Sequence, residues 1–119
     1  MSSHYYAEVL EESSEGSKER EREVIQRSIK LLNIARDKGH RSREAIDALY
    51  YLDRLWGLLL DDLAHEGNRL PKELRASLIS IGIWILREVE GIRSGSSNNF
   101  DGLIDISETI RDGLGGPLN

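Results

Sequence analysis

The sequence predicts an all-α protein, an antiparallel four-helix bundle, on three observations. Apolar residues recur three and four positions apart in four successive segments, which is the spacing of one face of an α-helix. Glycine-bearing loops of about four to seven residues separate these segments, and loops this short make sequential helices neighbours in space. The segments show no alternation of apolar and polar residues, the pattern of a half-buried β-strand.

The first helix is predicted over residues 17–38. It opens with the charge run KEREREVIQR, after which the apolar residues follow helical spacing. Lys38 in the last turn and Gly39 directly after it are typical of a helix end, because glycine readily adopts the left-handed conformation found there. The apolar positions of this helix are Val24, Ile25, Ile29, Leu31, Leu32 and Ala35.

The two ends of the chain are expected to lie outside the bundle domain, which spans residues 17–114. Residues 1–16 place Tyr5, Tyr6, Val9 and Leu10 beside an acidic run. We expect them to form either a short docked helix or an arm that orders only on contact. Residues 115–119 are predicted to be a flexible tail.

The second helix is predicted over residues 42–66. The hydroxyl of Ser42 can cap its first turn by accepting a hydrogen bond from a free backbone amide. Gly67 is expected to end this helix, and Pro71 to stand in the first turn of the next, where its fixed φ is favourable. The stripe of apolar residues is Ala45, Leu49, Leu52, Trp56, Leu59 and Leu63, widened by Tyr51, Leu55 and Leu58.

The third helix, predicted over residues 71–93, contains the apolar run LISIGIWIL. Gly82 falls in the middle of its core face, where a missing Cβ favours close approach of a neighbouring helix. Ile83 and Trp84 lie well away from the centre of that face. Two interpretations stay open: a central helix buried on all sides, or a helix whose Ile83 and Trp84 border a groove for a partner. The core face comprises Leu74, Leu78, Ile81, Ile85, Val89 and Ile92.

The fourth helix is predicted over residues 99–114. Asn98 can cap it, and Asp101 three residues later lies near the positive end of the helix dipole. Its single apolar face consists of Phe100, Leu103, Ile104, Ile110 and Leu114.

The composition indicates one acidic domain without cysteine. The chain has 119 residues, with 16 Lys and Arg against 21 Asp and Glu, for a net charge of −5. This balance disfavours broad binding to nucleic acid or to an anionic membrane. The N-terminus lacks the features of a signal peptide, and the longest apolar runs fall short of the roughly 18 residues of a spanning helix. We expect a soluble protein with no membrane insertion.

The sequence contains no recognisable catalytic motif, and we expect neither an enzyme nor a cofactor. No G-x-S-x-G, Walker or G-x-G-x-x-G pattern occurs. Asp61 and His65 have the spacing to share a metal, but no third ligand is evident, so a solvated helix end is favoured. The most basic stretch, RDKGHRSR at residues 36–43, is typical of a loop between helix ends. An RNA contact there is disfavoured because the cluster has no aromatic residue for stacking.

Three stretches of the chain together resemble FlaF, the flagellar biosynthesis protein of alphaproteobacteria. They are SREAIDALYYLDRLWGLLLDDLA, LPKELRASLISIGIWILREVEGIRSG and NFDGLIDISETIRDGL, in the family's order and spacing. The resemblance runs from about residue 13 to residue 114. It implies a small cytoplasmic helical protein that supports flagellin synthesis and export and acts alongside FlbT, the regulator of flagellin mRNA translation. It implies no catalytic residues.

The leading hypothesis is therefore an export chaperone that binds amphipathic flagellin segments in a groove. We expect Trp56, Ile83 and Trp84 to form its rim, with Phe100 positioning the fourth helix over it. An alternative is a regulator of flagellin expression that docks on FlbT or on the mRNA complex. A third possibility is an oligomer that buries the same apolar surface between copies.

Overall fold

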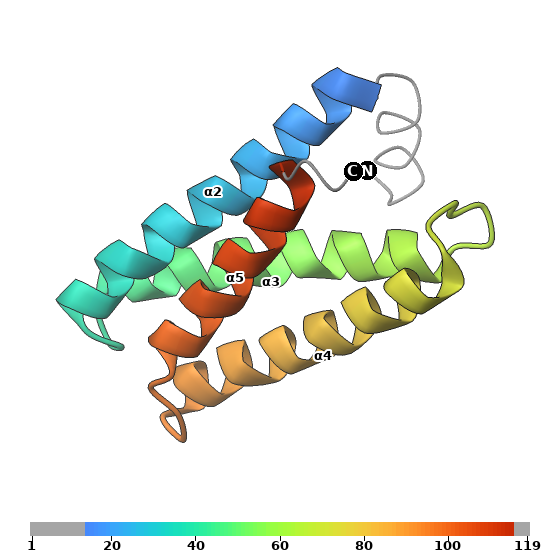
Figure 1. Ribbon diagram of the computed structural model, residues 1–119. Coiled ribbons are helices and arrows are strands. Elements are labelled where there is room, and N and C mark those ends of the chain that lie inside the picture. The colour runs from blue at the N-terminus through green and yellow to red at the C-terminus, as the bar shows by residue number, and fades with distance from the viewer. Residues whose placement is uncertain (1–13, 116–119) are drawn as a thin grey trace.

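The computed structural model describes residues 14–115, and these form four α-helices packed as a bundle. Figure 1 shows their arrangement. The all-α four-helix prediction is confirmed. Most of the predicted arm at residues 1–16, and residues 116–119 of the tail, lie outside the described residues. The helices are α2 (Ser14–Lys38), α3 (Arg43–Ala64), α4 (Lys72–Ser94) and α5 (Phe100–Gly115).

The junction between α2 and α3 has the local signals that were predicted for it. Gly39 takes a φ of 104°, and its amide donates to the carbonyl of Ala35 at 2.8 Å, which closes the last turn of α2. The Ser42 hydroxyl accepts from the amide of Ala45 at 3.0 Å and caps α3. Because the end of α2 and the start of α3 are both defined by local chemistry, the two helices form a tight antiparallel hairpin. A hydrogen bond from the Tyr51 hydroxyl of α3 to the Val24 carbonyl of α2 joins them.

Helix α2 begins at Ser14, three residues before its predicted start, and the two ends next to the α3–α4 loop are also wrong by one or two residues. Helix α3 ends at Ala64, because His65 has extended backbone and its amide already donates to the Asp62 carbonyl at 3.1 Å. Gly67 therefore follows the turn and does not end the helix. The start of α4 is also shifted, because Pro71 is the N-cap residue and not part of the first turn.

The cap of α5 is Asn99, one residue after the predicted Asn98. The side-chain oxygen of Asn99 accepts from the amide of Gly102 at 3.0 Å. The helix begins at Phe100, whose side chain is 2% exposed. Burial of Phe100 in the core places the first turn one residue later than the capping pattern alone suggested.

Helices α2 and α3 are the centre of the bundle, and each carries one further helix. Helix α4 packs on α3, and α5 packs antiparallel on α2. Two polar contacts join α5 to α2, one near each end of α5. An ion pair of 2.7 Å links Arg36 to Asp101, and Arg111 donates a hydrogen bond of 2.8 Å to Gln26. Buried apolar residues from all four helices form one continuous core, which includes Leu32, Leu52, Trp56, Ile85 and Leu103.

Helices α4 and α5 diverge from the short loop that joins them (Figure 1). The expectation that sequential helices are neighbours is therefore wrong for this pair. The reason lies in their buried faces. On α4, Ile85 and Val89 are buried in the core beside α3, whereas α5 is held by Arg36 and Gln26 of α2.

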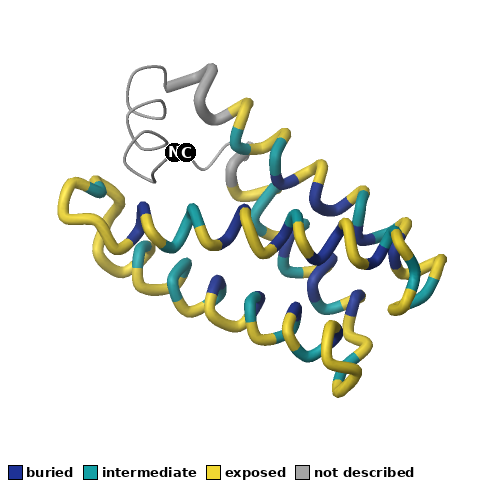
Figure 2. Tube along the Cα trace, turned by 180° about the vertical axis from the view of Figure 1, so that it is seen from behind, coloured by how far each residue is buried: buried dark blue, intermediate teal, exposed yellow. Residues whose placement is uncertain are grey.

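Gly82 is a site of close helix approach, as predicted. A Cβ at this position would lie 2.8 Å from Trp56 Cε3 and 2.8 Å from Leu60 Cδ2, both on α3. The interpretation of α4 as a helix buried on all sides is wrong, because Ile83 is 43% exposed and Trp84 is 38% exposed. Figure 2 shows buried positions along one side of the helices and exposed positions along the other.

Candidate functional site

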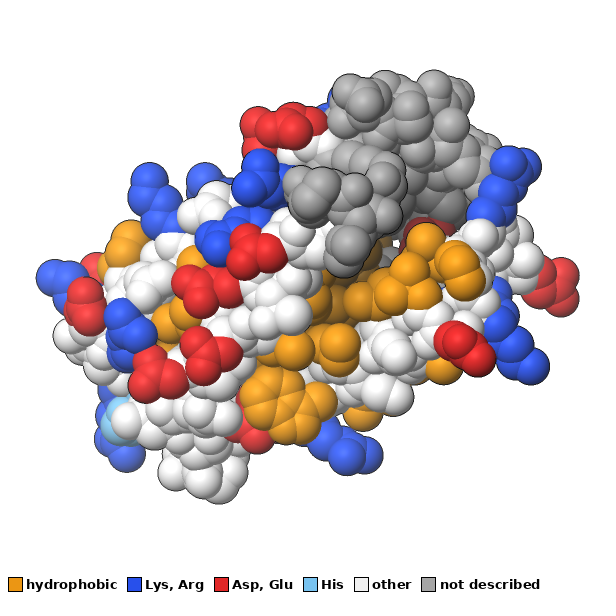
Figure 3. All heavy atoms as spheres, viewed as in Figure 1, with side chains coloured by type: hydrophobic (Ala, Val, Ile, Leu, Met, Phe, Trp, Pro, Cys, Tyr) orange, Lys and Arg blue, Asp and Glu red, His pale blue; other side chains and the backbone are white. Residues whose placement is uncertain are grey.

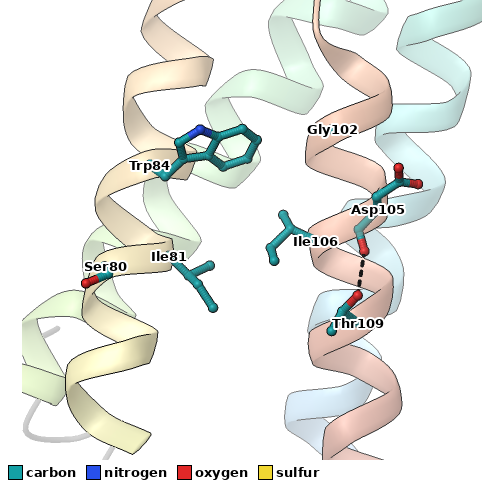
Figure 4. A pocket seen from close by; sticks show the side chains of 7 residues that line it. All are labelled: Ser80, Ile81, Trp84, Gly102, Asp105, Ile106 and Thr109. Carbon is teal, nitrogen blue, oxygen red and sulfur yellow. Dashed lines mark hydrogen bonds between the residues drawn. The ribbon is translucent and has the colours of Figure 1, made fainter. Parts of the chain in front are cut away.

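An apolar groove of about 510 Å³ lies between α4 and α5. Figure 4 shows the side chains of Ile81 and Trp84 extending from α4 toward α5, and that of Ile106 extending from α5 toward α4. In Figure 3 hydrophobic side chains gather in the hollow between these two helices. The lining residues are Ser80, Ile81, Trp84, Gly102, Asp105, Ile106 and Thr109.

Helical spacing explains how α4 forms one wall of the groove. Ile81 and Trp84 are three residues apart and therefore project from the same side of the helix. The neighbouring Gly82 faces α3, and its lack of a side chain lets the backbones of α3 and α4 come close together. Ile81 is half-buried against the core, and Trp84 extends farther into solvent. Apart from the exposed Ser80, the α4 wall is thus apolar.

The α5 wall combines one isoleucine with small and polar residues. Gly102, Ile106 and Thr109 follow one another at steps of four and three, on one side of the helix. The hydroxyl of Thr109 donates to the Asp105 carbonyl at 3.0 Å, so its polar group is already satisfied (Figure 4). A Cβ at Gly102 would collide with the capping side chain of Asn99, which explains a glycine at this position.

One charge borders the groove. Asp105 is the single ionisable residue of the lining, it is exposed, and no ion pair engages it within residues 14–115. On the same helix Asp101 pairs with Arg36 and Asp112 with Arg111. The walls carry three large apolar side chains and one carboxylate that no residue within 14–115 pairs with. Such a groove suits an amphipathic helix that carries a basic residue beside its apolar face.

The residues predicted for the rim occupy three different environments. Trp84 is exposed on the groove lining. Ile83 is exposed but is not part of the lining, because its neighbour Trp84 points about 100° away from it around the helix. Trp56 is 2% exposed and lies beneath α4, so its placement on the rim is wrong. Phe100 is buried in the core at the start of α5, where it fixes the position of that helix.

Of the seven lining residues only Trp84 was predicted from the sequence, and the two isoleucines are the most important of those missed. Ile81 was assigned to the core face of its helix, although it faces the core on one side and the groove on the other. Ile106 lies outside the apolar face predicted for the fourth helix. An isoleucine off the core face of an otherwise acidic helix was the available signal for the second wall.

The basic stretch at residues 36–43 is partly neutralised by acidic neighbours. The hydrogen bond and charge of Asp101 raise the pKa of Arg36, and Arg43 lies 3.9 Å from Asp47. Of its four basic side chains, Lys38 and Arg41 remain outside these ion pairs. This arrangement weakens the stretch as a patch for a polyanion.

Within residues 14–115, no helix is both long enough and apolar enough to cross a bilayer. In the same part of the chain, no group of three or more His, Cys, Asp or Glu side chains is placed to hold a metal ion. At Asp61 and His65, whose spacing alone suits a shared metal, the Nδ1 atom of His65 accepts from the amide of Gly67 at 2.9 Å.

A comparison with known protein families identifies a match. A family model described as flagellar protein FlaF matches residues 2–114, nearly the whole chain. Neither a curated protein nor a solved structure matches significantly. The matched range includes both walls of the groove and confirms the resemblance noted in the sequence.

Proposed function

Because the chain belongs to the FlaF family of flagellar proteins, we propose that it binds flagellin as a cytoplasmic export chaperone. The flagellin segment it binds is an amphipathic helix, which lies in the groove between α4 and α5. The observation that carries this proposal is the groove itself, where no other helix within residues 14–115 covers the apolar side chains of α4 and α5. The proposed role is binding, without catalysis.

Exposed apolar surface in the groove supplies the driving force. Trp84 is 38% exposed, which for a large aromatic side chain corresponds to roughly 90 Å² open to a partner. Covering that area contributes about 2 kcal/mol, or roughly 30-fold in affinity. Ile81 and Ile106 add to this from the two walls. A flagellin helix that waits for assembly has an apolar face of its own to cover, so the contact benefits both proteins.

Asp105 sets the orientation of the bound helix. A lysine or arginine beside the apolar face of the segment can pair with this carboxylate at the open edge of the groove. At an exposed position the pair contributes little affinity, about 0 to 1 kcal/mol. Its effect is to favour one direction of the segment over the other.

Calorimetry with purified flagellin tests the proposal, with Trp84→Ser as the groove variant. Ile83→Ser is the matched control. Ile83 directly precedes Trp84 in the sequence and is similarly exposed, but it does not line the groove. Trp84→Ser should weaken flagellin binding by about 10- to 30-fold, whereas Ile83→Ser should leave it within about twofold. Equal effects of the two substitutions would exclude the groove as the binding site.

A parallel titration with FlbT distinguishes the chaperone from the regulator. The alternative role, control of flagellin synthesis through FlbT, predicts binding to FlbT and none to flagellin. Direct contact with flagellin mRNA would instead weaken steeply with salt and with Arg41→Glu.

A further inference from the structure

A second exposed apolar surface lies on α3, on the side turned away from the core. Ile46 is 61% exposed and Tyr50 is 58% exposed, the highest values among the large hydrophobic residues of the described chain. At 100° per residue, Ile46, Tyr50, Asp53 and Gly57 fall within about 60° of one another. We define this strip, together with the adjacent Arg54, as the α3 outer face. In Figure 2, α3 crosses the near side of the molecule with exposed positions along its length.

No contact within residues 14–115 requires a glycine at position 57. It lies in the middle of α3, where glycine destabilises a helix relative to alanine. A Cβ at this position would meet nothing within 4 Å, and its φ is not in the left-handed region. Gly82, the buried glycine of α4, differs because α3 presses against it. A glycine that is costly and unexplained in one copy is explained by close approach of another surface.

The α3 outer face is complementary to itself. We propose that it is a two-fold symmetric interface with a second copy of this chain, the two α3 helices running antiparallel. A two-fold axis between Asp53 and Arg54 places the Tyr50 ring of one copy over Gly57 of the second copy, and the reverse. The ring then occupies the space that the missing side chain leaves open. The same axis places Arg54 of one copy beside Asp53 of the second.

The charges of the face favour this arrangement over a parallel one. Each copy contributes one arginine and one aspartate to the centre, so the symmetric pairing forms two opposite-charge contacts. Within a copy, the Arg54 guanidinium lies 5.8 Å from the Tyr50 ring centroid and 3.5 Å from its hydroxyl, which positions both groups on this face. Specific pairing is needed because the net charge of −5 opposes non-specific association of two copies.

Dimerisation through α3 leaves the groove open. The groove is on the side seen in Figure 3, whereas the α3 outer face is on the opposite side, seen in Figure 2. The inference is therefore independent of the proposed binding of flagellin. Each copy of the dimer keeps one groove.

A charge-exchange experiment on the full chain tests the interface by sedimentation equilibrium. The wild-type chain should show a reversible monomer–dimer equilibrium. Asp53→Arg and Arg54→Asp should each weaken self-association at least tenfold, because each places like charges across the axis. An equal mixture of the two variants should form a heterodimer of near wild-type affinity, since its two contacts again join opposite charges. Gly57→Arg should also block the dimer, whereas Trp84→Ser should not affect it.

Thermal unfolding of each variant shows whether it is folded, which matters because Asp53 also lies 3.9 Å from Arg93 within one copy. A wild-type chain that stays monomeric up to near-millimolar concentration would overturn the inference. So would a wild-type dimer that survives both Asp53→Arg and Gly57→Arg in folded protein. Binding of FlbT that depends on Tyr50, in a monomeric chain, would assign the face to that partner instead.

Discussion

The two mid-helix glycines provide a test of the packing in which one substitution should have opposite effects. Gly57→Ala adds a methyl group where nothing lies within 4 Å, so it should stabilise α3 by up to about 1 kcal/mol through helix propensity alone. Gly82→Ala gains the same propensity but adds a methyl group against α3. Both changes are made in a chain that carries Arg54→Asp, so that self-association does not contribute.

The cost at Gly82 follows from the two atoms that the new methyl group meets. Leu60 Cδ2, at 2.8 Å, is the end of a flexible side chain that can move aside. Trp56 Cε3, also at 2.8 Å, belongs to a ring that is 2% exposed and fixed in the core. Since carbon atoms prefer about 3.5 to 4.0 Å, α4 must shift, and overpacking of this kind costs about 1 to 3 kcal/mol. The net effect of Gly82→Ala is a loss of roughly 1 kcal/mol.

Thermal and urea unfolding of the two variants and their parent measure this difference. The expected gap of roughly 2 kcal/mol between Gly57→Ala and Gly82→Ala corresponds to a difference in Tm on the order of 10 °C for a domain of this size. If Gly82→Ala stabilises the chain as much as Gly57→Ala does, α3 and α4 are not in the close contact described.

Three further predictions concern the ends and the core of the helices. Asn99→Ala should cost about 1 kcal/mol of stability by unfolding, whereas Asn98→Ala should cost almost nothing, because only Asn99 caps α5. Phe100→Ala should cost about 3 to 5 kcal/mol in the same assay. Burial raises the pKa of the Tyr51 hydroxyl above its ordinary value of about 10. The unfolded chain therefore loses this proton first, stability falls as pH rises past about 10, and Tyr51→Phe should reduce that fall.

Local signals in the sequence were sufficient where the structure at that point is determined locally. Gly39 and Ser42 show this, since one supplies a positive φ and the other a capping hydroxyl within the same short turn. Gly67 shows the limit of the reasoning. A glycine after an apolar stripe suggested a helix end, but the backbone had already turned at His65. The pattern of residue types does not distinguish these two cases.

The groove depends on how the helices pack, which periodicity does not determine. The apolar arc of α4 was visible in the sequence, but its division into a face toward α3 and a wall toward α5 depends on where α5 lies. That position is set by contacts far apart in sequence, such as Arg36 with Asp101. Trp56 was placed on the rim for the same reason, because a large aromatic residue at helical spacing fits a core and a rim equally well.

The two tryptophans of the chain allow the central claim to be tested in one measurement. In protein labelled with 5-fluorotryptophan, Trp84 on the groove and Trp56 in the core give separate fluorine resonances, which Trp84→Phe assigns. On addition of flagellin, the Trp84 resonance should shift or broaden in proportion to the bound fraction, while that of Trp56 stays nearly constant. Binding of flagellin with an unchanged Trp84 resonance would contradict the assignment of the groove as its site.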